Sequence, residues 1–358
     1  MMRPLATRSA LRPPTPARMP RILPAGRALS ALLLAVLLAA PGRAQVRSGT
    51  TAAQFLLIEP DARIAAMGNA GAALAEGAMG AYYNPGVLGT LTRSEAGFSH
   101  STWLADIAYD YGAVAVRFGG TTALLAVTSL NSGEMDVRTP EQPLGTGERF
   151  TVQNLALGVG VGRAFSDRFS AGAQVKAVRE TVWHSSATAV ALDVGVLYRL
   201  PVRGAVLGAA VSNFGTRSRF SGRDLSVRFD PNTGANGDNS NLPAALETES
   251  QALPIFFRVG LGLPVALGTA GDLALAVDAF QPSDDANSVS LGAEWSYAGT
   301  VFARGGFQNL GLPDAEGGLT LGAGLRTAVA GFDVRFDYGW ADHGRIGQAQ
   351  RFTLGLGF

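Results

Sequence analysis

Large apolar residues alternate with small or polar residues along most of this chain. Near the C-terminal end, for example, Phe332, Val334 and Phe336 alternate with Asp333 and Arg335. Successive side chains of a β-strand point to opposite faces, so a period of two places the large apolar groups on one face. The same period returns in many other segments. The pattern therefore predicts an all-β protein.

Turn-forming residues divide the alternating sequence into separate strands. Their total is about 14, an even number, as in single-chain barrels of bacterial outer membranes. The predicted strands lie near residues 94–101, 107–118, 121–132, 149–165, 168–183, 187–200, 204–213, 252–266, 271–281, 287–297, 300–308, 317–327, 331–340 and 347–358.

The second face of these strands is built mainly from Gly, Ala, Ser and Thr. A soluble sandwich would also alternate, but its polar face meets water and is usually rich in charged residues. Here only 16% of the residues are charged, and 46 are glycine. A large apolar face and a small, polar face suit lipid outside and a crowded lumen inside. We therefore expect residues 94–358 to form a transmembrane outer-membrane β-barrel.

The connections between the predicted strands support this fold because short and longer ones alternate, as periplasmic turns and external loops do in such barrels. Gly119-Gly120 and Ser166-Asp167 are tight, whereas 133–148 and 214–251 are long. With both chain ends on the periplasmic side, loop 214–251 is external. Tryptophans also fall at external strand ends, where aromatic rings meet lipid headgroups; they are Trp103, Trp183 and Trp340.

Residues 1–44 read as a secretory signal peptide. The 13-residue apolar run at 28–40 follows Arg21 and Arg27 and precedes the small-residue site before Gln45. A retained anchor is the weaker alternative because a membrane-spanning helix needs about 20 apolar residues. A start at Met19 would give the signal peptide a more ordinary length.

Charge and cysteine content remove several classes of function. Residues 1–44 hold seven arginines and no acid, so the remaining chain carries 22 basic and 28 acidic residues, a net charge of −6. With Lys176 as the only lysine, this chain offers no basic surface for nucleic acid. The absence of cysteine excludes disulfides and thiol chemistry.

Residues 45–93 do not alternate and are rich in Ala and Gly. A barrel of about 14 strands leaves room for a polypeptide inside, so we expect residues 45–93 to form a plug, or hatch, in the lumen. The turn Tyr83-Asn84-Pro85-Gly86 would fix the plug geometry, since free tails rarely carry such aromatic turn chemistry. A flexible periplasmic tail is the alternative.

Several short motifs lie along residues 49–358. They are Gly49–Ile58, Asp61-Ala62-Arg63, Met67-Gly68, Tyr83-Asn84-Pro85-Gly86 with Leu88, Asn213-Phe214-Gly215, Leu253-Pro254 before Arg258-Val259-Gly260, Gly292–Trp295, Arg304–Phe307, Asp337-Tyr338-Gly339 and Gly344–Gly347 through Arg351-Phe352. Together these motifs resemble the PorV/PorQ family of FadL-like outer-membrane proteins, over most of this range. Gly86 departs from the resemblance, because FadL-like proteins usually have Ala after Asn-Pro.

The resemblance implies a 14-stranded barrel in outer-membrane lipid, with an N-terminal hatch and a C-terminal aromatic, Phe358, read by the barrel assembly machinery. It also implies two functions. PorV-like members deliver or retain cargo proteins of the type IX secretion system, whereas FadL-like members pass long-chain fatty acids or other hydrophobic molecules across the membrane.

Charged residues on the inward face are the candidate lumen contacts. Both signs occur, so they either pair with one another and the plug or form a polar path for a ligand. We single out Lys176, Arg258, Asp278, Arg304 and Arg335.

The sequence gives little support for catalysis, a metal site or a cofactor. It has only three histidines, and His184 and His343 lie in separate predicted loops. Loop residues 230–241 are rich in Asp and Asn but miss the calcium-binding pattern, so a flexible surface loop is the better interpretation. We therefore expect a protein that is not an enzyme.

Two functions stay open. Our first hypothesis is PorV-like protein secretion or surface delivery, because loop 214–251 is polar and suits a protein partner. The alternative is FadL-like transport of a hydrophobic ligand.

Overall fold

The structure of the chain is a computed structural model, which describes residues 49–231, 241–312, 315 and 317–358. The predicted signal peptide at residues 1–44 and the first plug residues lie outside this range. Within it, no helix has the length and apolar character needed to cross a membrane.

Most of the described chain is β-strand. The strands are β1 (Glu95–Thr102), β2 (Ala108–Phe118), β3 (Thr121–Asp136), β4 (Arg149–Ala164), β5 (Phe169–Val182), β6 (Ser185–Arg199), β7 (Val206–Gly215), β8 (Ser221–Gly222), β9 (Ser226–Phe229), β10 (Leu242–Ala245), β11 (Phe256–Ala266), β12 (Asp272–Pro282), β13 (Ser288–Tyr297), β14 (Val301–Leu310), β15 (Leu319–Val329), β16 (Phe332–Asp342) and β17 (Gln348–Gly357).

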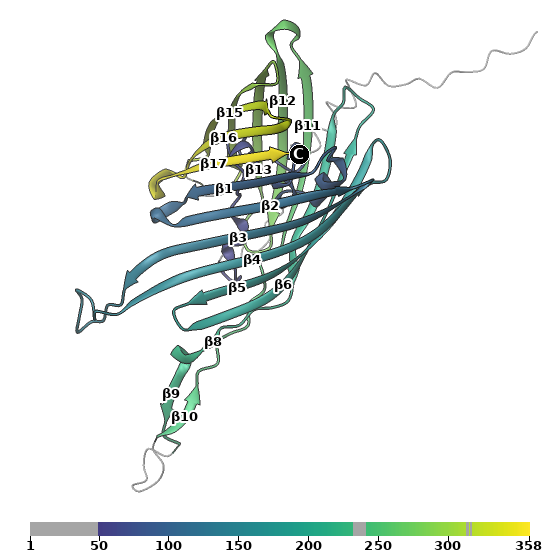
Figure 1. The fold of residues 1–358 in the computed structure, drawn as a ribbon. Helices are drawn as coiled ribbons and strands as arrows, with labels where there is room; N and C mark the ends of the chain where they lie inside the picture. Colours follow the sequence, from purple (N-terminus) through teal and green to yellow (C-terminus); the bar gives the residue numbers. More distant parts are fainter. Residues whose placement is uncertain (1–48, 232–240, 313–314, 316) are drawn as a thin grey trace, which may run out of the picture. The chain divides into compact units, whose positions relative to one another are not determined.

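Strands β1–β7 and β11–β17 form one closed antiparallel barrel of 14 strands (Figure 1). β7 pairs with β11, and the C-terminal β17 pairs with β1 in the register Glu95 to Gly357. The predicted fold class is confirmed. The predicted strand ends lie within a few residues of those observed, because the turn residues that divide the sequence also divide the barrel.

The two ends of the barrel differ. At one end, here called the turn end, connections such as Gly119-Gly120 are short. The other end, the loop end, carries the connections 137–148 and 216–255. The long connection contains β8 and the β9–β10 hairpin, which projects beyond the barrel (Figure 1).

One loop-end connection is shorter than expected. Trp183 and His184 alone join β5 to β6, because β6 begins at Ser185 rather than near residue 187. Trp183 adopts a φ of 52°, in the left-handed region that a two-residue hairpin turn requires.

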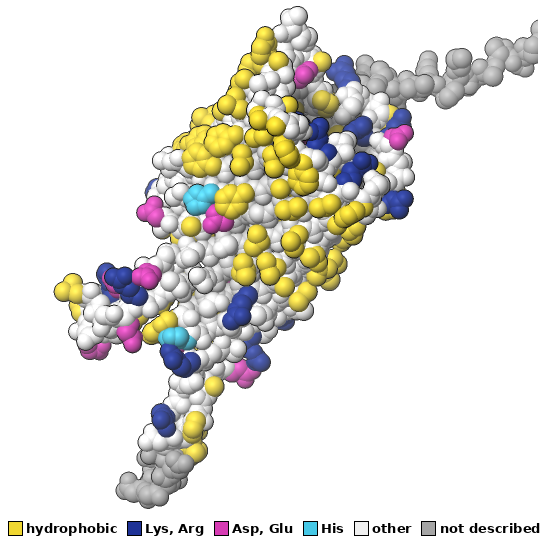
Figure 2. Space-filling view, viewed as in Figure 1, with side chains coloured by type: hydrophobic (Ala, Val, Ile, Leu, Met, Phe, Trp, Pro, Cys, Tyr) yellow, Lys and Arg dark blue, Asp and Glu magenta, His cyan; other side chains and the backbone are white. Residues whose placement is uncertain are grey.

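The alternation in the sequence becomes an alternation in exposure. On the outer wall, Leu157 is 51% exposed and Leu354 is 52% exposed, whereas their inward neighbours Gly158 and Thr353 are buried. Figure 2 shows hydrophobic side chains gathered across the strands. A monomer in water rarely exposes apolar surface on this scale, so the outer wall is suited to contact with lipid.

Residues 51–93, here called the N-terminal segment, lie against the inner wall. The segment contains short helical turns: η1 (Gln54–Leu57), α2 (Ala62–Ala65), η2 (Met79–Tyr82) and η3 (Pro85–Thr90). Its backbone bonds to inward side chains of distant strands; for example, Ala62 N donates to Thr353 Oγ1 at 2.9 Å.

Inward-facing glycines let the N-terminal segment approach the wall this closely. A Cβ at Gly208 would lie 1.9 Å from the carbonyl oxygen of Ala72, and one at Gly172 would lie 2.1 Å from that of Pro85. Any larger residue at these positions would force the segment away.

Candidate functional site: the lumen and the N-terminal segment

The turn Tyr83-Asn84-Pro85-Gly86 lies at the centre of the contact between segment and wall. Asn84 caps η3, since its Oδ1 accepts a hydrogen bond from Gly86 N at 2.9 Å. Its Nδ2 donates to Ala72 O at 2.8 Å and to Val196 O of β6 at 3.0 Å. One buried side chain therefore joins two parts of the segment to the barrel.

The two neighbours of this cap are also held closely. Asp61 N donates to the hydroxyl of Tyr83 at 3.3 Å, and burial among acidic neighbours raises the pKa of this phenol well above its usual value. Gly86 accepts a hydrogen bond from Ser170 Oγ at 2.9 Å. A Cβ on Gly86 would lie 2.9 Å from Val196 Cα, which explains why glycine, rather than alanine, fits here.

A chain of buried charges crosses from the segment to three strands. Arg63 donates from Nε and Nη2 to the two carboxylate oxygens of Glu294, each at 2.8 Å. Arg304 Nε donates to the same carboxylate at 2.5 Å, and its Nη1 lies 2.8 Å from Asp337 Oδ1. Arg335 Nε lies 2.8 Å from the other oxygen of Asp337. Positive and negative side chains therefore alternate through this network, from Arg63 to Arg335.

Arg63 is the member of this network that belongs to the N-terminal segment. Burial lowers the pKa of its guanidinium, but the carboxylates of Glu76 and Glu294 outweigh burial and raise it well above its usual value. Its charge is therefore permanent. Together with Glu294 it forms a bidentate ion pair, the strongest geometry available to an arginine.

Arg258 and Asp278 lie on the paired strands β11 and β12 but bind different parts of the segment. Asp278 Oδ2 accepts a hydrogen bond from Ala72 N at 2.7 Å. Arg258 lies 3.4 Å from Glu59 Oε1, and its guanidinium lies 5.2 Å from the ring centroid of Tyr83. Both candidate residues therefore contact the segment, one through its backbone and one through its side chains.

Lys176 lies apart from these groups. Its Nζ is 2.8 Å from Asp193 Oδ2 and also bonds to Asn213 Oδ1. Asn213, with a φ of 62°, occupies an irregularity in the pairing of β6 with β7. The lysine thus holds this part of the wall and does not contact the segment through any bond found among the described residues.

Apolar residues surround the loop-end part of the segment. Phe55 and Leu56 pack with inward residues of β2–β6 in one buried cluster, which also contains Ala53, Tyr109, Leu130, Ala156, Val178, Ala189, Ala191 and Leu253. This part of the lumen is lined by aliphatic and aromatic side chains. The charge network instead contacts the segment at Arg63.

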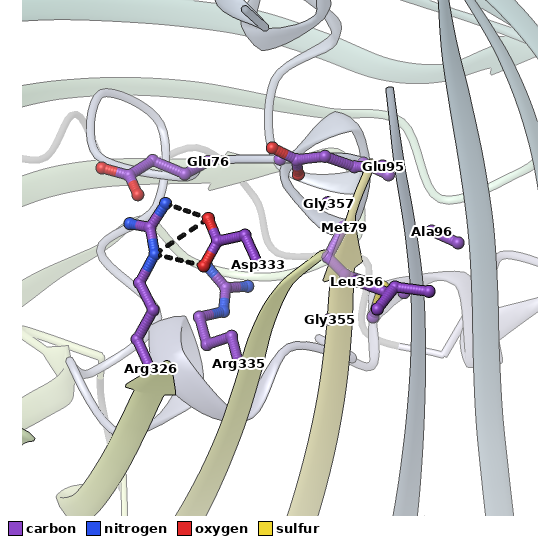
Figure 3. A pocket seen from close by; sticks show the side chains of 13 residues that line it. Glu76, Met79, Glu95, Ala96, Arg326, Asp333, Arg335, Gly355, Leu356 and Gly357 are labelled. Carbon is purple, nitrogen blue, oxygen red and sulfur yellow. Dashed lines mark hydrogen bonds and ion pairs between the residues drawn. The ribbon is translucent and has the colours of Figure 1, made fainter. Parts of the chain in front are cut away.

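A small polar cavity of about 50 Å³ lies at the turn end, between the segment and β1, β15, β16 and β17 (Figure 3). Arg326 Nε donates to Asp333 Oδ1 at 2.9 Å there. Glu76, Glu95 and Arg335 complete the charged lining (Figure 3). The cavity has room for water but not for a ring compound.

Sequence reasoning missed the segment's own charged groups, Arg63 and Glu59. Arg63 stood in the quoted Asp61-Ala62-Arg63 motif, and a lone arginine in an apolar stretch was a usable signal.

The histidines do not assemble with one another: His184 pairs with Asp224 of the long connection, and His343 packs on Trp103. No group of residues suited to a metal occurs within the described ranges. Residues 232–240 of the predicted surface loop lie outside them.

The C-terminal Phe358 lies at the turn end beside the first strand. Its backbone N donates to Ser94 O at 2.9 Å, and its ring is exposed. Its role as an assembly signal stays a prediction.

Fold and lumen together define a transmembrane β-barrel of the outer-membrane type, with a chain segment packed against its inner wall. No protein-family model matches the chain, and no curated protein matches it by sequence. Among solved structures it is similar to the CymD monoaromatic hydrocarbon channel, at 13% identity and a TM-score of 0.51, over 84% of this chain and 97% of that one. The toluene transporter TodX of Pseudomonas putida gives the same identity, TM-score and coverage.

At 13% identity these similarities show the barrel fold, and they give no support to the PorV/PorQ part of the resemblance.

Proposed function

We propose that this protein is an outer-membrane channel for small hydrophobic molecules and that the N-terminal segment is its plug. The observation that carries the proposal is the segment's place in a barrel whose fold resembles two hydrocarbon channels. The apolar cluster around Phe55 and Leu56 gives the loop end of the lumen a surface that such molecules would enter.

The packing implies that transport requires the segment to move. Pockets that hold small ligands typically measure about 300–1,000 Å³, whereas the cavity at the turn end measures about 50 Å³. A hydrophobic molecule that enters at the loop end therefore leaves only after the segment shifts from the wall near β11 and β15–β17.

Protein secretion is the second candidate. The feature that favours it is the exposed hairpin β9–β10 with the polar residues before and after it. The structural comparisons favour hydrophobic transport over this hypothesis.

A disulfide between plug and wall tests the proposal. A Cβ at Gly262 would lie 3.5 Å from that of Ala73, within the range for a disulfide, and the chain has no cysteine of its own. We expect the oxidised Ala73→Cys/Gly262→Cys variant to lose uptake of labelled toluene or oleate and to regain it on reduction. The single variants are the controls, and Gly262→Cys also reports the displacement of Leu74, whose Cδ2 lies 2.4 Å from the new Cβ.

Two results would contradict the proposal. One is uptake at the parental rate while mass spectrometry shows the disulfide complete. The other is a deletion strain with unchanged uptake that loses a set of large surface proteins, which would establish the secretion hypothesis instead.

A further inference from the structure

A groove of about 450 Å³ lies on the wall formed by β4, β5 and β6, near the loop end. Two rows of outward side chains line it, and the inward-pointing Val178 and Ala189 also border it. The register places Ala177 between Leu157 and Val190, and Arg179 between Leu155 and Thr188. Thr216 follows β7 and closes one side, where its N donates to Val190 O at 2.9 Å.

The groove belongs to the outside of the barrel. Leu157 and Val190 are each about half exposed, whereas their inward neighbours Val178 and Ala189 are buried in the lumen cluster. Ala177 lies between the larger side chains of Leu157 and Val190. Its small side chain therefore leaves the groove deepest at this position. In the membrane this hollow faces lipid.

Arg179 is unusual for its position. It points outward, three residues before the end of β5, and no carboxylate lies within ion-pair distance of it among the described residues. Arg163 of β4 also points outward without an ion pair among the described residues, but it lies at the turn end, whereas the outward His100 of β1 pairs with Asp110 at 2.7 Å. Between the strand ends, the outward side chains of β11–β17 are all uncharged.

An arginine on the lipid-facing side of a barrel costs free energy that grows with its depth in the bilayer. Beyond Arg179 the outward residues become polar, with Gln153, Thr181 and Ser186. Arg179 thus lies where the apolar wall ends, at the level of lipid headgroups. An anion there would give the guanidinium a bidentate partner.

We infer that this groove binds a phosphorylated lipid of the external leaflet, with its phosphate on Arg179 and an acyl chain along Leu157, Ala177 and Val190. A neutral hydrocarbon would use the apolar floor but leave the arginine without an anion. A protein partner would need to meet the groove within the membrane. The positive charge of Arg179 and the apolar lining of the groove together favour an anionic lipid. The inference does not depend on the transport proposal.

Lipopolysaccharide is the probe that tests the site, since it carries phosphates and acyl chains. The detergent-solubilised full chain is compared with Arg179→Gln, with Ala177→Leu, which fills the groove, and with Arg163→Gln, an outward arginine at the turn end of β4. Binding is measured by native mass spectrometry and by the shift in unfolding temperature, with phosphatidylcholine as the comparison, since choline balances the charge of its phosphate and leaves no net charge.

We expect lipopolysaccharide to stabilise the parent and Arg163→Gln, and phosphatidylcholine to have little effect. Arg179→Gln and Ala177→Leu should bind at least tenfold more weakly, and Arg179→Lys should recover part of the loss. The heat-dependent gel shift of each variant checks that it folds.

Equal binding by the parent and Arg179→Gln would overturn the inference. So would an Ala177→Leu variant that keeps lipid binding but slows uptake of hydrophobic molecules, because the groove would then serve the transported compound. Failure of the plug disulfide test alone would leave the lipid site standing, so the two proposals fail separately.

Discussion

At the residue scale, Glu294 joins the two sides of the buried network, because among the described residues its carboxylate is the one that binds both Arg63 and Arg304. Replacing it with Gln should lower stability by about 3 kcal/mol, since two buried guanidinium groups would lose the anion that they share. The midpoint of the heat-dependent gel shift measures this loss. Glu76→Gln is the matched control, because Glu76 also faces Arg63 but lies 3.7 Å away with an exposed side chain. Equal effects of the two variants would show that the network contributes little.

His343 provides a pH dependence at the loop end. Burial, and then the charge of Arg351, lower the pKa of this imidazole, which also packs on Trp103 at a centroid distance of 5.0 Å. The unfolded chain therefore binds a proton more readily than the folded one. This contribution to stability is complete above the unfolded pKa of about 6.5 and is lost as the pH falls below it.

The expected outcome is a fall in unfolding temperature between pH 8 and pH 5 that is larger for the parent than for His343→Gln. Other groups also titrate in this range, so the difference between the two proteins is the quantity to measure. His100→Gln, with its exposed imidazole, is the control. A parent and His343→Gln that respond alike to pH would rule out this role.

Residue identities on the inward face could be predicted from the period of two, but their partners could not. Arg304 and Arg335 follow from strand alternation, whereas their link through Asp337 and Glu294 to Arg63 depends on how the segment folds back. Sequence separation of more than 200 residues between Arg63 and Glu294 leaves no local signal for this pair.

Among the elements, β5 and η3 fit together because β5 has glycine where η3 approaches. Gly172→Ala should destabilise the barrel by about 1–3 kcal/mol, because its new Cβ would lie 2.1 Å from the Pro85 carbonyl. Gly305→Ala is the control, since its nearest neighbour would be Leu321 at 3.8 Å. Unfolding midpoints measure stability, and trypsin cleavage of the segment measures its displacement. Equal unfolding midpoints and equal trypsin cleavage of the two variants would show that the close approach of η3 to β5 does not affect stability.

The strands themselves were predictable to within a few residues because alternation and turn residues are local signals. The β5–β6 connection has two residues, one fewer than the three between the expected strands. Trp183 in a left-handed conformation carries no sequence signature comparable to Asn-Gly, so a longer loop was expected there.

On the scale of the whole molecule, the question is what fills a barrel of this width. Deleting residues 51–90 while retaining residues 1–50, which include the predicted signal peptide, should leave a folded barrel that conducts ions in planar bilayers, with conductance steps that the full chain lacks. About eight strands fill their own interior, and a barrel of 14 leaves a space that the segment occupies here. A folded deletion variant without conductance would show that the lumen closes by other means.

Sequence alone determined the barrel, its strand number, which face meets lipid and which charges point inward, because a period of two, glycine-rich turns and loop lengths are all written locally along the chain. Only the tertiary structure decided how residues 51–93 pass over the wall. It also brought Arg63 to Glu294 and placed Arg179 beside an apolar hollow. These contacts join residues that are far apart in the chain. The distances between their side chains depend on how the strands pair, and the pairing register has no local signal in the sequence.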